Sequence, residues 1–189
     1  MDISKEISSL YDEYKQRALD IPFETDVLTG CLQREMLFKA IDAQEFDSVP
    51  IGLIYFEAIG MGHVTDMHGP LVGDELLCRM TSNIHDVLRD SMRIYRIHYN
   101  GFLIVFPRCT DFELAQFIDD WLSLQVKRNK EQDKFICVSA VGSAWSSGNT
   151  DFFELFNAAH AVFGEDKRRK DMIYSPAAVL KADERAKGL

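Results

Sequence analysis

Several features that would assign a chain to a special class are missing from this sequence. No apolar run reaches the roughly 18 residues that a membrane-spanning helix requires. The N-terminal segment, Met-Asp-Ile-Ser-Lys-Glu, lacks the basic and then apolar pattern of a secretory signal peptide. The four cysteines are widely spaced and form no C-x-x-C pair, which argues against a zinc site and favours reduced thiols. We therefore expect a cytoplasmic protein without a membrane segment.

Positive charge is also scarce. The chain has 21 Lys and Arg residues against 30 Asp and Glu residues, which gives a formal net charge of −9. Nucleic acids and anionic membranes require a basic face, so this balance argues against both as partners. The only basic run is Lys167–Lys170, and such a run is typical of a solvated helix end.

The sequence contains enough apolar residues to form one substantial hydrophobic core. Of its 189 residues, 47% are hydrophobic and 27% are charged, as in ordinary globular domains. The spacing of Ile3, Ile7, Leu10 and Tyr14 predicts an amphipathic helix. We expect an N-terminal helix or stalk over residues 1–22, a single domain over 23–175 and a tail over 176–189.

The clearest local signal is a β-hairpin between Arg93 and Phe106. Two β-branched and aromatic runs flank Asn100-Gly101, a dipeptide that favours the positive φ angles of a two-residue type I′ turn. A hairpin tip holds side chains rigidly, so we expect the residues at this tip to bear on function.

The remaining elements follow from periodicity and turn residues. Helices are predicted up to Ala43, over 74–89, after an N-cap at Thr110, and from Thr150 to Gly164. Strands are predicted over 49–56, 135–144 and 172–174. Irregular segments are predicted at Gly60–His63 and 127–134. A hairpin inserted among strand–helix units predicts an α+β fold with a mostly antiparallel five-stranded sheet flanked by helices, of ferredoxin-like type.

Three motifs carry a family resemblance. Asp26-Val27-Leu28-Thr29-Gly30 with Arg34 matches D-x-L-T-G-x-x-x-R, Gly69 and Gly73–Leu77 match most of G-H-x-x-G-D-x-x-L, and Val141-Gly142 resembles the glycine that ends a later strand. In this order and spacing they resemble the GGDEF family of diguanylate cyclases, which condense two GTP into cyclic di-GMP. The resemblance implies the nucleotide-cyclase palm fold, with the signature on the hairpin.

The resemblance also implies two divalent cations held by carboxylates, and here the chain departs from the family. Glu57 stands at the first carboxylate and is the candidate metal ligand. The signature reads His98-Tyr99-Asn100-Gly101-Phe102: Asn100 offers a neutral amide, which is a poor Mg²⁺ ligand, and Gly101 offers no side chain. His98 and Tyr99 replace two glycines. We therefore expect no catalytic residue at the tip and no cofactor, with Mg²⁺ only if nucleotide binding is retained.

Other positions that the resemblance assigns to ligands are also altered. Thr65 replaces the asparagine that binds the guanine edge in the family, while Asp74 keeps the partner aspartate. Asp74 can also be interpreted as a helix N-cap, and we favour this interpretation. The phosphate-binding Lys and Arg correspond to Asp166 and Lys170, although a slip of one residue brings Lys167 into place. Glu57 has an alternative interpretation as a solvated strand end, which we favour over a metal ligand.

The product site of the family uses an R-x-x-D motif, which reads Arg89-Asp90-Ser91-Met92 here. Arg89 remains as a candidate ligand-binding residue, but Met92 replaces the acid. Three functions stay open: an inactive regulatory or interaction module in cyclic di-GMP signalling, a residual diguanylate cyclase, and a sensor of GTP or cyclic di-GMP without turnover. A protein partner or a second copy would contact the N-terminal helix or the hairpin tip, because exposed aromatic tips are favoured anchors.

Overall fold

The computed structural model describes residues 3–17, 23–131 and 137–173. Five strands form one sheet: β1 (Leu32–Gln33), β2 (Ile51–Ala58), β3 (Arg93–Arg96), β4 (Gly101–Pro107) and β5 (Ser139–Ser146). They lie in the order β1-β3-β4-β2-β5. Only the β1–β3 pair is parallel among the pairs of this sheet, so the predicted mostly antiparallel five-stranded sheet is confirmed.

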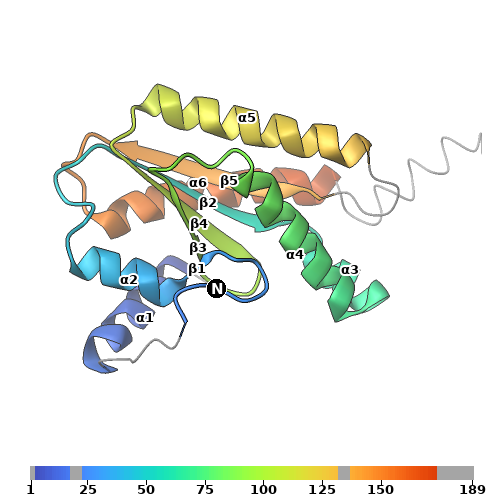
Figure 1. The fold of residues 1–189 in the computed structure, drawn as a ribbon, viewed down its shortest axis with the longest axis horizontal. Helices are drawn as coiled ribbons and strands as arrows, with labels where there is room; N and C mark the ends of the chain where they lie inside the picture. Colours follow the sequence, from blue (N-terminus) through green and yellow to red (C-terminus); the bar gives the residue numbers. More distant parts are fainter. Residues whose placement is uncertain (1–2, 18–22, 132–136, 174–189) are drawn as a thin grey trace, which may run out of the picture.

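Six helices cover the two faces of the sheet (Figure 1): α1 (Ile3–Arg17), α2 (Arg34–Asp42), α3 (Met61–His68), α4 (Pro70–His85), α5 (Asp111–Lys130) and α6 (Phe152–Ile173). Helices α3, α4 and α5 lie on one face, and α1, α2 and α6 lie on the other. Alternate residues of a strand point to opposite faces, so the fully buried β2 contributes to two separate cores.

The first core lies between the sheet and α3, α4 and α5. Its centre is aromatic: the ring of Phe56 lies 5.3 Å from that of Phe102 and 4.8 Å from that of Trp121. The second core lies between the sheet and α1, α2 and α6, and includes Tyr55 and Phe156, whose rings are 5.7 Å apart. Burial of these faces supplies most of the free energy that holds the elements in place.

Helix α1 is a packed element of the second core. Ile7 and Tyr11 are buried, and the Tyr11 ring lies 5.4 Å from Phe38 of α2 and 5.2 Å from Phe153 of α6. The helix predicted for this region is confirmed, and its packing follows the amphipathic spacing. The predicted end of this helix at Ile21-Pro22 and the tail over 176–189 lie outside the described residues.

The hairpin over 93–106 is confirmed, but its predicted two-residue type I′ turn is wrong. Four residues, 97–100, connect β3 to β4, and the Ile97 N–H donates to the Gly101 carbonyl oxygen at 2.9 Å. Neither Asn100 nor Gly101 has a positive φ. Gly101 is instead the first residue of β4, and it pairs with Glu57 of β2.

Several helix boundaries differ from the predictions. The segment Gly60–His63, predicted as irregular, enters α3, and Lys127–Lys130 continues α5. Helix α4 begins at Pro70, four residues before the predicted start, because Gly69 adopts φ +88° and proline fits the first helical position. Asp74 therefore lies inside α4, and its predicted role as an N-cap is wrong.

The fifth strand is also not the predicted one. Residues 172 and 173 belong to α6, which runs well past the predicted end at Gly164, and Tyr174 lies outside the described residues. The fifth strand is instead the two-residue β1, which pairs Leu32 with Tyr95 and Gln33 with Arg96. A strand this short has no periodicity that the sequence can reveal.

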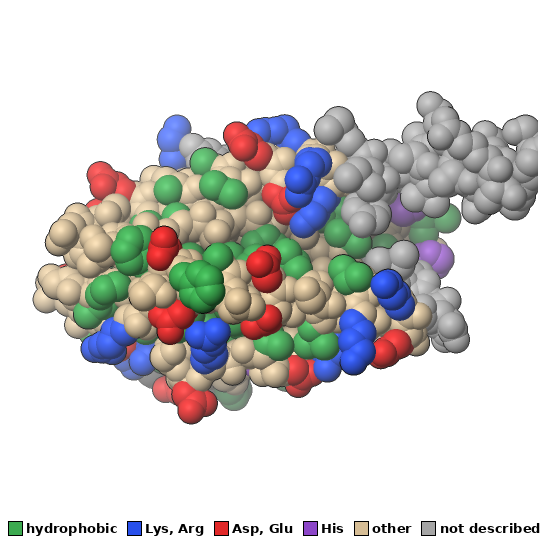
Figure 2. All heavy atoms as spheres, turned by 90° about the horizontal axis from the view of Figure 1, so that it is seen from above, with side chains coloured by type: hydrophobic (Ala, Val, Ile, Leu, Met, Phe, Trp, Pro, Cys, Tyr) green, Lys and Arg blue, Asp and Glu red, His purple; other side chains and the backbone are tan. Residues whose placement is uncertain are grey.

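Acidic and basic side chains alternate on the α5 side of the molecule. Figure 2 views this face and shows red and blue side chains interspersed, with no continuous basic area. Within the described ranges, no helix combines the length and apolar character that crossing a membrane requires.

Candidate functional site

The hairpin tip and the Asp26–Gly30 turn form one structured region. Arg96 joins them, donating to Asp26 Oδ1 at 2.7 Å and to the Tyr99 carbonyl oxygen at 2.7 Å. Asp26 Oδ1 also accepts hydrogen bonds from the N–H and the hydroxyl of Thr29, and Gly30 completes the turn at φ +71°. A hollow of about 280 Å³ lies beside this region. Residues about 70 positions apart in sequence are thus held together by one guanidinium.

Glu57 lies at the centre of a polar cluster beneath the tip. Only 2% of Glu57 is exposed, so the interpretation as a solvated strand end is wrong. Its Oε1 accepts a hydrogen bond from the Tyr55 hydroxyl at 2.8 Å, and its Oε2 accepts one from Lys167 Nζ at 2.5 Å. His98 Nε2 lies 2.6 Å from the Tyr55 oxygen and 3.5 Å from Glu57 Oε1. Because the Tyr55 hydroxyl donates to Glu57, it accepts from His98 Nε2–H.

This cluster keeps Glu57 ionised. Burial alone raises the pKa of the Glu57 carboxyl, but hydrogen bonds from His98, Lys167 and Tyr55 lower it, so that the pKa falls to about 2. Burial raises the pKa of Tyr55, and the neighbouring Glu57 charge raises it further, so the phenol stays protonated and remains a donor. The fixed charges of the cluster are one carboxylate and one ammonium.

Helix α6 brings Lys167 to this position through a close approach to β5. A Cβ atom on Gly142 would lie 2.1 Å from the Ala159 carbonyl oxygen and 2.1 Å from the Phe163 nitrogen, so only glycine fits. Gly142 lies within β5 rather than at its end, which corrects the expectation from the motif. Lys167, the lysine that a slip of one residue brings into the motif, lies next to Glu57.

Asp166 and Lys170 are engaged within the fold. Asp166 Oδ2 accepts from the Val141 N–H at 2.9 Å and from Lys170 Nζ at 2.7 Å, and Lys170 also donates to the Ser139 carbonyl oxygen at 2.7 Å. The Lys170 side chain is only 18% exposed, so the interpretation of Lys167–Lys170 as a solvated helix end is wrong for Lys170, whereas Lys167 is 41% exposed and pairs with Glu57. The Asp166–Lys170 pair ties α6 to β5.

Thr65, Asp74 and Tyr99 lie around a second position, where α3 meets α4. The Thr65 hydroxyl is buried and has no hydrogen-bond partner. A Cβ atom on Gly73, the neighbour of Asp74, would lie 2.7 Å from the Thr65 hydroxyl and 3.6 Å from the Tyr99 hydroxyl. Tyr99 is 52% exposed, and its hydroxyl lies near the contact between Thr65 and Gly73.

Arg89 is remote from both positions. Its guanidinium lies 5.5 Å from the centre of the Phe106 ring and 3.9 Å from Glu113, near the far end of β4. Phe106 is five residues along the extended strand from Gly101, which is roughly 17 Å. Met92, at the acid position of the R-x-x-D motif, is buried in the first core.

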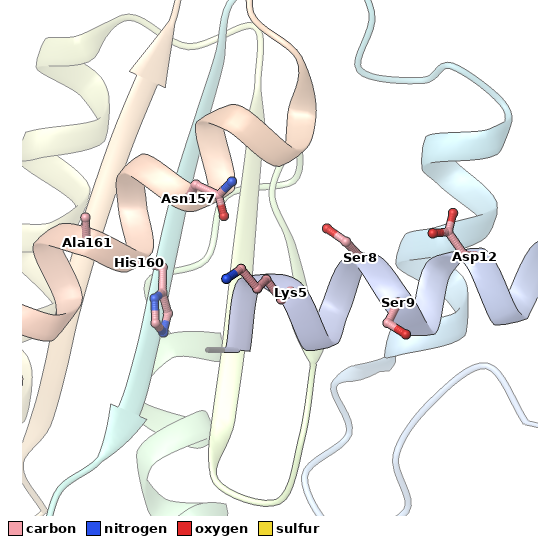
Figure 3. Close-up of a pocket in the computed structure, with 7 residues that line it drawn as sticks. All are labelled: Lys5, Ser8, Ser9, Asp12, Asn157, His160 and Ala161. Atoms are coloured by element: carbon pink, nitrogen blue, oxygen red, sulfur yellow. The ribbon is translucent and has the colours of Figure 1, made fainter. Parts of the chain in front are cut away.

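A separate polar groove of about 580 Å³ runs between α1 and α6. Its lining residues are Lys5, Ser8, Ser9 and Asp12 of α1 and Asn157, His160 and Ala161 of α6, and Figure 3 shows the Lys5 side chain extending toward Asn157 and His160. The His160 ring packs 5.2 Å from Tyr55, which belongs to the Glu57 cluster. Nothing in the sequence pattern indicated this groove.

Sequence reasoning identified Glu57 and His98 but missed Tyr55. The two-residue spacing of Tyr55 and Glu57 places them on the same face of β2, and this spacing could have indicated their contact. In the described part of the chain, no three His, Cys, Asp or Glu side chains gather closely enough to hold a metal ion.

Comparisons with known proteins bear on the family and the fold. A family model described as "Diguanylate cyclase, GGDEF domain" matches residues 23–172. Diguanylate cyclase DgcM of Escherichia coli K12 is 22% identical over 155 residues, which cover 78% of this chain but 38% of DgcM. The chain thus spans well under half of that relative.

Solved structures share the fold. The coiled coil and GGDEF domain of DgcB from Caulobacter crescentus, in complex with cyclic di-GMP, has a TM-score of 0.69 at 20% identity, over 88% of this chain and 91% of that one. Diguanylate cyclase SiaD from Pseudomonas aeruginosa, in complex with its activator SiaC, has a TM-score of 0.68 at 18% identity, over 87% and 68% of the two chains. Because the family model covers most of the sequence, the chain belongs to the GGDEF domain family.

Proposed function

We propose that this domain is a catalytically inactive GGDEF module that acts in cyclic di-GMP signalling, in the cytoplasm, as a regulatory, binding or interaction domain. The observation that carries the proposal is the state of Glu57. Both of its carboxylate oxygens are engaged by the chain's own donors, and the tip from Ile97 to Gly101 contains no other carboxylate.

A residual cyclase that uses Glu57 and Asp74 is the less favoured reading. Glu57 points to the face of the sheet that α6 covers, whereas Asp74 belongs to α4 on the opposite face. Two carboxylates on opposite faces do not clamp one pair of metal ions, which in two-metal sites lie about 3.5–4 Å apart.

The test is turnover. The purified chain is incubated with GTP and Mg²⁺ or Mn²⁺, and cyclic di-GMP is measured chromatographically, alongside an active diguanylate cyclase. We expect no product above background. Product that disappears in Glu57→Gln contradicts the proposal, because it shows that the carboxylate supports the reaction; product that persists in this variant points to a contaminating enzyme.

One observation favours nucleotide binding without turnover. The unpartnered Thr65 hydroxyl lies where α3 packs against Gly73 of α4, the residue before Asp74. A buried hydroxyl without a partner loses free energy that a hydrogen-bonding ligand can restore. The polar edge of a guanine base, from GTP or cyclic di-GMP, has donors and acceptors suited to Thr65 and Asp74.

Calorimetry with GTP and with cyclic di-GMP tests this second candidate. Tyr99→Ala removes a phenol that lies close to Gly73 and gives a ligand more room, so we expect it to strengthen any binding there, whereas Thr65→Val weakens it. Phe112→Ala is the control, because Phe112 is 73% exposed at the start of α5 and is not a candidate ligand-binding residue. If neither nucleotide binds at high micromolar concentration, only the protein-interaction role remains.

A protein partner or self-association is supported by two exposed surfaces. Tyr99 presents a half-exposed ring at the tip, and α1 keeps its polar side exposed while its apolar side packs on the domain. The similar SiaD structure is a complex with a protein activator, SiaC, which supports a protein-binding role. Light scattering over a concentration series, with Tyr99→Ser as the variant, distinguishes a self-associating tip from a monomer.

A further inference from the structure

The contact between Lys167 and Glu57 joins two elements 110 residues apart in sequence. Lys167 Nζ lies 2.5 Å from Glu57 Oε2 and 5.4 Å from the centre of the Phe163 ring. Glu57 is 3% exposed at its side chain, whereas Lys167 is 41% exposed. The carboxylate is therefore almost fully removed from water, and the ammonium approaches it from the solvent side.

A buried carboxylate requires a compensating positive charge. Removing an ion from water carries a large penalty, which only a close counter-ion and further hydrogen bonds offset. The other neighbours of Glu57 are Tyr55, a neutral donor, and His98, which lies 3.5 Å away and donates to the Tyr55 oxygen. Among these three side chains, Lys167 is the one that carries a permanent positive charge, and it lies closest to the carboxylate.

The residues around Glu57 do not fit the divalent cation that the family resemblance implies. Mg²⁺ requires near-octahedral oxygen coordination, commonly through one or two carboxylates together with waters and phosphates. Here Oε2 faces an ammonium and Oε1 accepts from a phenol, and neither Asn100 nor Gly101 contributes a charged oxygen. A Cβ atom on Gly101 would also lie 2.2 Å from His98 Nε2, so the His98 ring fills the space beside the strand.

We propose that Lys167 is a built-in counter-ion whose ammonium takes the place of a divalent cation at Glu57. The domain keeps its tip charge-balanced and folded without metal, and the site is closed to Mg²⁺ by the chain itself. This inference rests on the proposed inactive function and extends it by naming the residue that closes the site.

The experiment measures thermal unfolding in EDTA and in millimolar Mn²⁺. The wild-type midpoint is expected to be the same in both. In Lys167→Met, which keeps the aliphatic stem but removes the charge, the midpoint in EDTA falls, and Mn²⁺ raises it again by binding the uncompensated carboxylate. Arg168→Met removes a charge from the same turn of α6 and behaves like wild type. In the double variant E57Q/K167M, the effect of Mn²⁺ disappears.

Three results overturn the proposal. The first is a rise in the wild-type midpoint with Mn²⁺ that is lost in Glu57→Gln. The second is a Lys167→Met variant whose midpoint does not respond to Mn²⁺. The third is failure of both Lys167→Met and E57Q/K167M to fold. If Lys167→Met fails to fold while E57Q/K167M folds, the missing charge is the cause, which supports the proposal. The turnover assay is independent: cyclic di-GMP produced by wild type contradicts the proposed function, whereas an inactive wild type whose Lys167→Met variant ignores Mn²⁺ contradicts only this inference.

Discussion

At the residue scale, the tip depends on the absence of a side chain at Gly101. A Cβ atom there would lie 2.2 Å from His98 Nε2 and 2.7 Å from the Tyr55 hydroxyl. The sequence suggested that Gly101 was needed for a positive φ, but its φ is not positive. Glycine is required because two side chains of the Glu57 cluster occupy the space beside it.

Gly101→Ala is therefore expected to destabilise the domain by about 1–3 kcal/mol, the usual effect of overpacking. Urea unfolding followed by circular dichroism measures this change. Gly164→Ala is the control, because its Cβ meets nothing closer than Arg168 at 3.7 Å. As a substitution inside α6, it is expected to stabilise by about 0.5–1 kcal/mol. Equal changes in the unfolding free energy for Gly101→Ala and Gly164→Ala would contradict the overpacking expected at Gly101.

The charge on Glu57 gives a dependence of stability on pH. The pKa of Glu57 is lowered from its ordinary value of 4.5 to about 2 in the fold, so the unfolded chain binds the proton more readily. This contribution is fully present above pH ~4.5 and is lost as the pH falls toward ~2, with a magnitude of roughly 3 kcal/mol.

Unfolding free energies of wild type and Glu57→Gln between pH 5 and 2 isolate this effect, because Asp26 and Asp166, whose pKa values are also lowered, remain in both. The difference between the two proteins is expected to shrink as the pH falls through this window. A constant difference would mean that Glu57 titrates alike in the folded and unfolded chains.

At the element scale, the best-predicted helix is the one with the strongest start signal. Thr110 was predicted as an N-cap, and its hydroxyl accepts from the Glu113 N–H at 3.2 Å while the Glu113 carboxylate accepts from the Thr110 N–H at 2.9 Å. This reciprocal capping box satisfies two N–H groups that a helix start leaves free.

Thr110→Ala is expected to lower the free energy of unfolding by about 1 kcal/mol, and Thr110→Ser by much less, because serine keeps the accepting oxygen. Chemical denaturation of the two variants under identical conditions makes the comparison. If serine and alanine destabilise equally, the effect comes from the lost methyl group and not from the cap.

Elements without such signals were mispredicted for identifiable reasons. Gly60 and Gly62 reduced the helical pattern of α3, although the helix forms against the first core through Met61. The start of α4 was assigned to Asp74 because aspartate is a common N-cap, while Pro70 at the first helical position was the better signal.

The Glu57 cluster could be anticipated only in part. The sequence placed Glu57 at a strand end, but no local pattern shows that Lys167 would reach it across 110 residues. That contact depends on α6 crossing β5 at Gly142, which is a tertiary feature.

At the scale of the whole molecule, the sheet could be predicted from the sequence because its central strands are buried on both faces. Strands β2 and β4 are almost entirely apolar, as expected for strands buried on both faces, and the hairpin and family motifs fixed their neighbours. Because the same strands supply both cores, neither core can lose its packing without loosening the sheet beneath the other. We therefore expect cooperative unfolding of the described domain.

This expectation can be tested with Trp121, which is fully buried in the first core. In a Trp145→Phe background, Trp121 is the sole tryptophan of the chain and reports on that core alone. Phe156→Ala truncates a buried ring in the second core and is expected to lower the unfolding free energy by about 3–5 kcal/mol. The Trp121 fluorescence transition should shift together with the circular dichroism transition, although Phe156 belongs to the opposite core.

Phe112→Ala, on the exposed side of α5, is the control and should change the unfolding free energy by no more than about 0.5 kcal/mol, because Phe112 is 73% exposed. A Trp121 transition that stays at its original denaturant concentration, while circular dichroism becomes biphasic, would show that the two cores unfold separately. The Glu57 cluster would then lie in the unit formed by the second core, since Tyr55 packs there against Phe156 and Phe163. Coincident transitions instead mean that the tip is as stable as the sheet that supports it.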